Sequence, residues 1–188
     1  MIASLSARKS ILTLALVVSL SGCASLAARP DPRVAEWQAM ANATAKAYGQ
    51  PAMPWVVVYK LSPRWGRHEG NTIALDERLL AQAPHDLILG VVAHELGHWV
   101  LGHGQGYRPA TQSIGNERDA NAEGVRVLVK LGRPQPEALR LMYAMLRRGH
   151  GGQYESGCDQ IRDLLGQFPT WRAAITPEPG FTSCLPTR

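Results

Sequence analysis

The chain has 188 residues, 45% of them hydrophobic, and a formal net charge of +5 at pH 7. This length suits one domain with a hydrophobic core, and the apolar content is ordinary for a globular protein. Without residues 1–22 the chain loses Arg8 and Lys9, and its charge falls to +3. So weak a positive charge argues against nucleic acid as a partner.

The N-terminus has the pattern of an export signal. Arg8 and Lys9 precede an apolar run at residues 11–20, which is too short to span a bilayer but suits the core of a signal peptide. The run ends in Leu-Ser-Gly-Cys, with the cysteine at position 23. This resembles the lipobox of bacterial lipoproteins, in which cleavage precedes the cysteine and the cysteine is then acylated.

We therefore expect a signal peptide at residues 1–22, a lipidated tether at 23–33 and a folded domain at 34–188. Acylation of Cys23 would anchor the protein to a membrane. Ala24, rather than an aspartate, follows the cysteine, and the sorting rule associated with such lipoproteins then indicates the periplasmic side of the outer membrane.

Two further cysteines remain, Cys158 and Cys184. An even number of cysteines in an exported protein indicates a disulfide, here one that ties the C-terminal tail to the domain. Two free buried thiols are the alternative.

The periodicity of apolar residues predicts an α+β fold that is mostly helical. We expect two strands, at residues 55–61 and 71–75, separated by a charged loop, in a small antiparallel sheet. The expected helices are at residues 34–48, 77–82, 84–101, 116–131, 136–148 and 159–165.

The helix at 84–101 is apolar nearly all round, which is typical of a central buried helix. Gly90 and Gly97 are seven residues apart and share one face. Because glycine costs about 1 kcal/mol inside a helix, the pair predicts that another backbone lies close to that face.

This helix contains the pattern His94-Glu95-x-x-His98. Positions i and i+4 of a helix point the same way, so both imidazoles can bind one metal ion. The spacing is the HExxH zinc pattern, in which the glutamate, here Glu95, is the general base on a metal-bound water. The alternative is two core histidines on a buried helix.

A catalytic zinc usually takes three protein ligands. His103 is a poor third ligand, because it would lie about 140° from His98 on a continuing helix and Gly102 breaks that helix. Glu117 is better placed, since one helix face carries Glu117 followed by small residues, Ala120, Asn121 and Gly124. A solvated surface charge is the alternative for Glu117, and Asp119 and Glu123 are reserve candidates.

The combination of the segment at 71–75, the HExxH helix as far as His103, and Glu-Arg-Asp-Ala-Asn at 117–121 resembles the HtpX-like and CAAX-prenyl-protease-like zinc metallopeptidases. The resemblance covers roughly residues 35–175, and the chain is similar to the small periplasmic lipoproteins of that family. It implies a zincin-like fold and one zinc per chain, with His94, His98 and Glu117 as ligands. It also implies that Glu95 is the base and that the strand of Ile73 is the edge that receives substrate.

The chain departs from the family pattern at two places. Asn121 replaces an aspartate that accepts a hydrogen bond from a ligand imidazole, so we expect weaker metal binding or altered basicity, although an amide oxygen can still accept. Phe168 replaces the histidine of a His-Pro pair, and His150 is a candidate to supply a polar group instead.

We expect a zinc endopeptidase of the bacterial envelope that cleaves unfolded or misassembled envelope proteins and has assembly proteins as potential partners. The alternative is a metal-binding lipoprotein that assists envelope assembly without cleavage. Glu95 favours the peptidase, because structural zinc sites take four protein ligands and have no use for a base.

Overall fold

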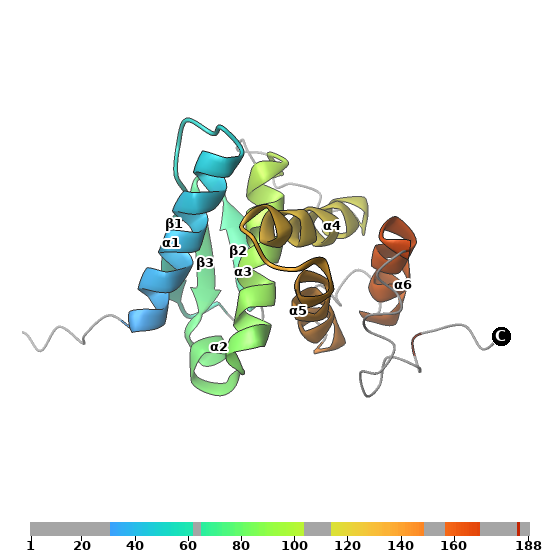
Figure 1. The fold of residues 1–188 in the computed structure, drawn as a ribbon. Coiled ribbons are helices and arrows are strands. Elements are labelled where there is room, and N and C mark those ends of the chain that lie inside the picture. The colour runs from blue at the N-terminus through green and yellow to red at the C-terminus, as the bar shows by residue number, and fades with distance from the viewer. Residues whose placement is uncertain (1–30, 62–64, 104–113, 149–156, 170–183, 185–188) are drawn as a thin grey trace, which may run out of the picture. The chain divides into compact units, whose positions relative to one another are not determined.

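A computed structural model describes residues 31–61, 65–103, 114–148, 157–169 and 184. Figure 1 shows the elements. The helices are α1 (Pro32–Ala47), α2 (Glu77–Gln82), α3 (His85–Val100), α4 (Ile114–Lys130), α5 (Gln135–Arg147) and α6 (Gly157–Gln167). The six helices expected from the sequence are present in this part of the chain, with ends within about two residues of prediction. None of these described helices has both the length and the apolar character needed to cross a membrane.

The sheet differs from the expected one. It has three strands in the order β1 (Trp55–Tyr59), β3 (Thr72–Asp76), β2 (Gly66–Glu69). β1 runs parallel to β3, and β2 runs antiparallel to it. The prediction that the strands at 55–61 and 71–75 are antiparallel is therefore wrong. The segment between them, expected to be a loop, contains β2, which forms a hairpin with β3. This hairpin reverses the chain once more, so β1 and β3 are parallel.

The two faces of the sheet have different environments. The register places Val56, Ile73 and His68 side by side on one face, and the first two are buried. Trp55 and Glu69 lie on the opposite face, where Trp55 is 67% exposed. The face of Ile73 therefore packs against α1 and α3 (Figure 1), whereas the face of Trp55 is exposed at that residue.

The two edges of the sheet also differ. At the β1 edge, the Gln38 side chain of α1 donates through Nε2 to Pro54 O (2.9 Å) and accepts through Oε1 from Val56 N (2.9 Å). Gln38 thus takes the place of a neighbouring strand at that point. No described strand pairs with the outer edge of β2. The strand of Ile73, expected to be the receiving edge, is central and both its sides are paired, so this expectation is wrong.

The central position of α3 agrees with the sequence, because the helix is buried from Leu87 to Trp99. A Cβ atom at Gly90 would lie 2.5 Å from Leu141 O of α5, and one at Gly97 would overlap Ala120 O of α4. The predicted close approach at the two glycines is therefore confirmed. It lets α4 and α5 lie directly against α3.

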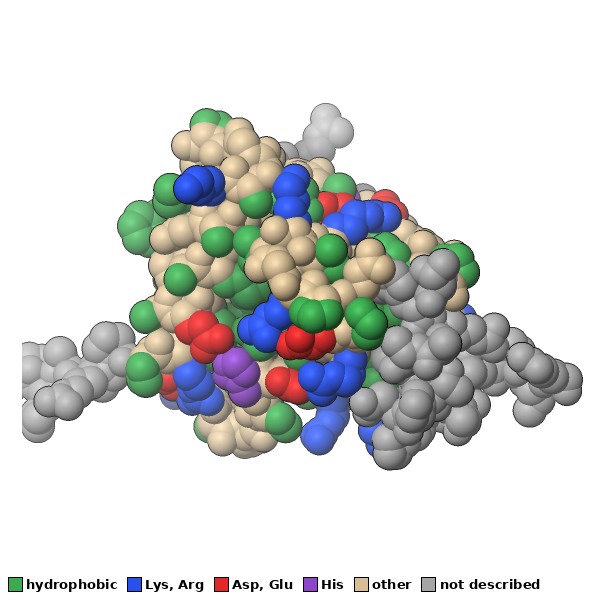
Figure 2. All heavy atoms as spheres, in the orientation of Figure 1, with side chains coloured by type: hydrophobic (Ala, Val, Ile, Leu, Met, Phe, Trp, Pro, Cys, Tyr) green, Lys and Arg blue, Asp and Glu red, His purple; other side chains and the backbone are tan. Residues whose placement is uncertain are grey.

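Surface polar contacts join the first turn of α3 to its neighbours. His85 lies 3.0 Å from Glu36 of α1, and Asp86 lies 3.0 Å from Arg140 of α5. Figure 2 shows acidic, basic and histidine side chains side by side on the lower part of this face. Exposed pairs of this kind contribute about 0–1 kcal/mol each, so burial of apolar surface holds α3 in place.

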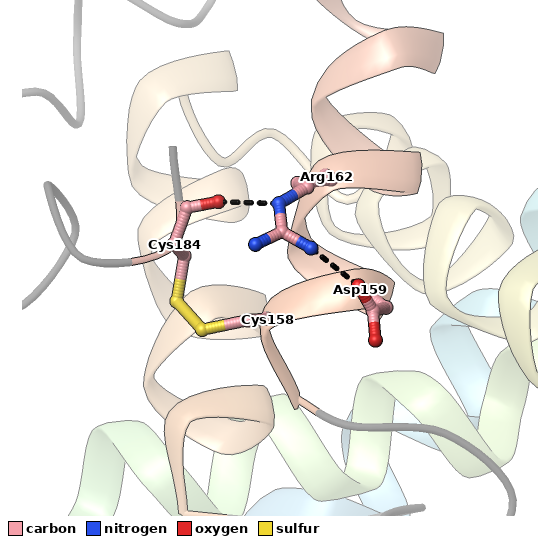
Figure 3. Close-up of a disulfide and its surroundings, with 4 residues drawn as sticks. All are labelled: Cys158, Asp159, Arg162 and Cys184. Atoms are coloured by element: carbon pink, nitrogen blue, oxygen red, sulfur yellow. Dashed lines mark hydrogen bonds and ion pairs between the residues drawn. A yellow bond between two sulfur atoms is a disulfide. The ribbon is translucent and has the colours of Figure 1, made fainter. Parts of the chain in front are cut away.

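The C-terminal tail is joined to α6 by the expected disulfide between Cys158 and Cys184, whose Cα atoms are 4.8 Å apart (Figure 3). Arg162 donates from Nε to Cys184 O (2.7 Å) and also pairs with Asp159. Residue 184 is thus held to α6 by a covalent bond and a hydrogen bond. Cys23 and His150 lie outside the described residues.

Candidate metal centre

His94 and His98 lie one turn apart on α3, and their Nε2 atoms are 3.1 Å from each other. Both residues are nearly fully buried, at 2% and 4% exposure. The helix that carries them is buried from Leu87 to Trp99. Packing around the helix therefore fixes the directions in which the two imidazoles point. They point to a common position, as the i and i+4 spacing predicts.

Glu117 joins this pair from α4. Its Oε2 lies 3.3 Å from His94 Nε2, and its Oε1 lies 3.6 Å from His98 Nε2. One nitrogen or oxygen from each of the three residues lies within 4.8 Å of the others. The predicted small-residue face explains this approach, because a Cβ at Gly124 would lie only 2.8 Å from Ala93 O of α3.

The two reserve candidates lie elsewhere. Asp119 is exposed to solvent. Glu123 is buried, but it accepts a hydrogen bond from the Tyr48 hydroxyl at Oε1 (2.7 Å) and pairs with Arg126 at Oε2 (3.0 Å). Of these three candidate carboxylates, the structure brings only Glu117 to a common position with the two histidines.

The donor separations fit a tetrahedral metal site. Zinc bonds to imidazole nitrogen and carboxylate oxygen are about 2.0–2.2 Å, which places two donors of a tetrahedron about 3.3–3.6 Å apart. The two separations that involve Glu117, 3.3 and 3.6 Å, fall in this range, and the 3.1 Å between the two histidines is slightly shorter. Two imidazoles and one carboxylate are also the donor set of an open catalytic site rather than a closed structural one.

The charges of the cluster favour a cation. Burial alone would lower the pKa of His94, but its hydrogen bond to Glu117 and the nearby charge of Glu95 raise it above the ordinary value. Burial opposes ionisation of Glu117, yet hydrogen bonds from His94 and His98 hold its pKa well below the ordinary range. The site therefore contains a buried carboxylate anion that needs a positive partner.

His94 makes a second contact through its other nitrogen. Nδ1 lies 2.8 Å from Asn121 Oδ1, and Asn121 Nδ2 donates to Gln160 Oε1 of α6 at 2.9 Å. Asn121 thus lies where the family pattern expects an acceptor, and its amide oxygen occupies the accepting position. Gln160 was not a candidate from the sequence.

His98 also makes a second contact, with His103, whose Nδ1 lies 2.9 Å from His98 Nδ1. The end of α3 explains this contact. Gly102 has φ +70°, Gly102 N donates to Trp99 O, and His103 N donates to His98 O at 3.0 Å. These bonds form a Schellman motif, which turns the chain back over the last helical turn. His103 is therefore a neighbour of a candidate ligand, and the glycine before it was the signal in the sequence.

Glu95 lies directly below β2. It is 3% exposed, and a Cβ at Gly66 would lie 2.6 Å from Glu95 Oε1 and 2.8 Å from Val91 Cγ1. Only glycine at this position lets the strand pass so close to the glutamate. No role for Gly66 is predicted from the sequence, because residues 66–69 contain no β-branched or large apolar residue that would indicate a strand.

The backbone of β2 offers hydrogen-bonding groups at its outer edge. Asp76 N donates to Trp65 O (2.8 Å), so this pair is bonded across the hairpin. Bonded and non-bonded pairs alternate in an antiparallel ladder. The register then directs the N–H and C=O groups of Gly66 and His68 away from β3.

Fold and site together define a metallopeptidase-like protein of the α+β, zincin-like class. Residues 31–107 match the model of a known family, described as peptidase family M48. This match confirms the resemblance drawn from the motifs: residues 31–107, fewer than half of the chain, are similar to peptidase family M48. The matched region contains the sheet and the HExxH helix but ends before Glu117. Comparison with curated proteins and with solved structures gave no match.

Proposed function

We propose that this protein is a zinc-dependent endopeptidase that cleaves unfolded or misassembled polypeptides of the bacterial cell envelope. The observation that carries the proposal is the convergence of His94, His98 and Glu117 on one position, with Glu95 of the same helix packed against Gly66 of β2. The proposed location, periplasmic and lipid-anchored at the outer membrane through Cys23, rests on the sequence of residues 1–33.

Each residue of the site has a definite part in the proposed chemistry. Bound zinc would supply Lewis acidity, which makes water a nucleophile near neutral pH and polarises the scissile carbonyl. Glu95 takes the proton from the attacking water and later returns it to the leaving amine. Donation from Nδ1 to Asn121 and His103 leaves Nε2 of each imidazole free to be a ligand.

The outer edge of β2 suits an extended peptide. The N–H and C=O groups of Gly66 and His68 can pair with a substrate backbone, as in other cases of strand addition. Such pairing does not depend on side-chain identity, and only a locally unfolded chain can present its backbone in this way. This favours unfolded polypeptides as the substrate class.

The test of the chemistry is Glu95→Gln. Glutamine keeps the size and an acceptor but cannot take a proton, so this variant should retain zinc and fold. Cleavage of an unfolded protein substrate should fall at least about a hundredfold, within the usual range for loss of a general base. Glu77→Gln is the matched control, because Glu77 is a half-exposed residue of α2 paired only loosely with Lys60 at 3.8 Å. It should cleave like the wild type.

Two results would contradict the proposal. A Glu95→Gln protein that holds zinc and cleaves at the wild-type rate would exclude Glu95 as the base. The second result has two parts: the wild type binds zinc but cleaves nothing, and cells in which Glu95→Gln replaces the wild type are unchanged. Together these would favour the alternative, a non-catalytic role in envelope assembly.

The proposed anchor is tested separately with Cys23→Ser. Without the thiol there is no site for acylation, so the protein should move from the membrane fraction to the soluble fraction. Ser25→Ala, two residues further on, is the control and should stay with the membrane. Membrane attachment of Cys23→Ser would show that another segment anchors the chain.

A further inference from the structure

Three buried side chains from three helices form a hydrogen-bonded row that ends at the candidate metal site. His94 of α3 bonds Asn121 of α4 (2.8 Å), and Asn121 bonds Gln160 of α6 (2.9 Å). Asn121 and Gln160 are each 1% exposed, and His94 is 2% exposed. At such low exposure, solvent water cannot replace any of these hydrogen bonds.

An amide in the middle position creates a problem that a carboxylate does not. His94 can be a metal ligand through Nε2 only if Nδ1 carries the proton and donates it. A carboxylate always accepts that proton. An asparagine has two ends of nearly equal size, one accepting and one donating, and with Nδ2 towards His94 it would favour the tautomer whose Nε2 is protonated and unable to bind metal.

We propose that Gln160 is a positioning residue of the metal centre, which holds the Asn121 amide with Oδ1 towards His94. Gln160 Oε1 accepts a hydrogen bond from Asn121 Nδ2. This bond holds the donating nitrogen of the Asn121 amide on the side away from His94. If Asn121 alone reversed, its oxygen would face the oxygen of Gln160 in a dry interior, and two buried hydrogen bonds would be lost. The inference rests on the proposed zinc site.

Contacts of α6 keep Gln160 in place. Gln160 follows two residues after Cys158, which is bonded to Cys184. Arg118 of α4 lies 3.6 Å from Asp163 of α6, and the backbone of Gly157 lies against Leu146 O of α5. α6 is thus held to both α4 and α5, as precise positioning of Gln160 requires.

The test compares zinc affinity, measured by chelator competition, among variants of the full-length protein. Gln160→Met removes the acceptor at similar volume and should weaken zinc binding about 10- to 100-fold, the usual effect of losing an outer partner of a ligand. Gln160→Glu can only accept, so it should bind zinc within a few-fold of wild type. Gln167→Met, at an exposed position of the same helix, is the matched control and should be unchanged.

The double variant Asn121→Asp with Gln160→Met separates positioning from packing. Aspartate needs no orienting partner, so this protein should regain affinity to within about threefold of wild type. If Gln160→Met binds zinc as tightly as wild type, or if Asn121→Asp does not restore the affinity, the inference is overturned while the zinc site stands. If the wild type itself binds no zinc, both the proposed function and the inference fail.

Discussion

The two histidines of α3 occupy equivalent positions but are supported in different ways. His94 is held by Asn121 of α4, and Asn121 is held in turn by Gln160 of α6. Asn121 lies 27 residues after His94 in the chain, and Gln160 lies 39 residues after Asn121. His98 is held by His103, five residues away, through the turn that ends its own helix. One support thus depends on how three helices pack, and the other on local backbone geometry.

The difference also appears in burial. Asn121 is 1% exposed, whereas His103 is only partly buried. A polar group lost from a dry position leaves its partner unsatisfied, while water can replace part of a contact near the surface. We therefore expect the support of His94 to be worth more to the metal site than the support of His98.

The largest effect is expected for Asn121→Leu. The change removes the acceptor of His94 and leaves Gln160 without its donor, so zinc affinity should fall about 10- to 100-fold and the free energy of unfolding by about 1–3 kcal/mol. Chelator competition and urea unfolding measure the two quantities. Asn121→Asp is the control and should keep the affinity, and equal losses in both variants would show that the acceptor is not the reason.

A smaller effect is expected for His103→Phe. Phenylalanine keeps a ring at the helix end but cannot accept from His98, and water can reach this partly buried position. Zinc affinity should fall about tenfold, with little change in unfolding free energy. A loss larger than that of Asn121→Leu in the same chelator assay would reverse the proposed order of the two supports.

The smallest effect is expected for Gly102→Ala. The residue has φ +70°, and among the described residues no atom beyond its chain neighbours lies within 4 Å of a new Cβ, so the cost is conformational, about 1 kcal/mol of unfolding free energy. Zinc affinity should fall only a few-fold, because the substitution affects the site only through a displacement of His103. Gly166→Ala in the exposed part of α6 is the control, and there urea unfolding should show equal or higher stability, because helical glycine is itself unfavourable.

The same contrast explains which features could be predicted from the sequence. Glu117 was found because its helix face has a local periodicity, and its position beside the HExxH pair follows from small residues on that face. Gln160 could not be found, since its role depends on how α6 packs against α4. The break at Gly102 could be predicted, but the contact of His103 with His98 could not, because it depends on the Schellman turn that follows.

In the fold, the helices were predicted closely because each has its own apolar pattern and end signals. β2 was missed because its residues are polar and it forms a strand only by pairing with β3. This one omission made the sheet appear antiparallel and made the strand of Ile73 appear to be an edge. The error thus arose where tertiary pairing, rather than local preference, determines the structure.

The shortness of β2 limits how tightly the protein can hold a chain. Only Gly66 and His68 direct backbone groups outward, which allows four hydrogen bonds at most. At a net 0.5–1.5 kcal/mol each, these bonds give roughly 2–6 kcal/mol before the cost of ordering the peptide, which corresponds to a dissociation constant between about 30 mM and about 40 μM. A chain bound only at this edge would dissociate quickly, so a segment that refolds soon after binding would usually escape and one that stays unfolded would be bound again.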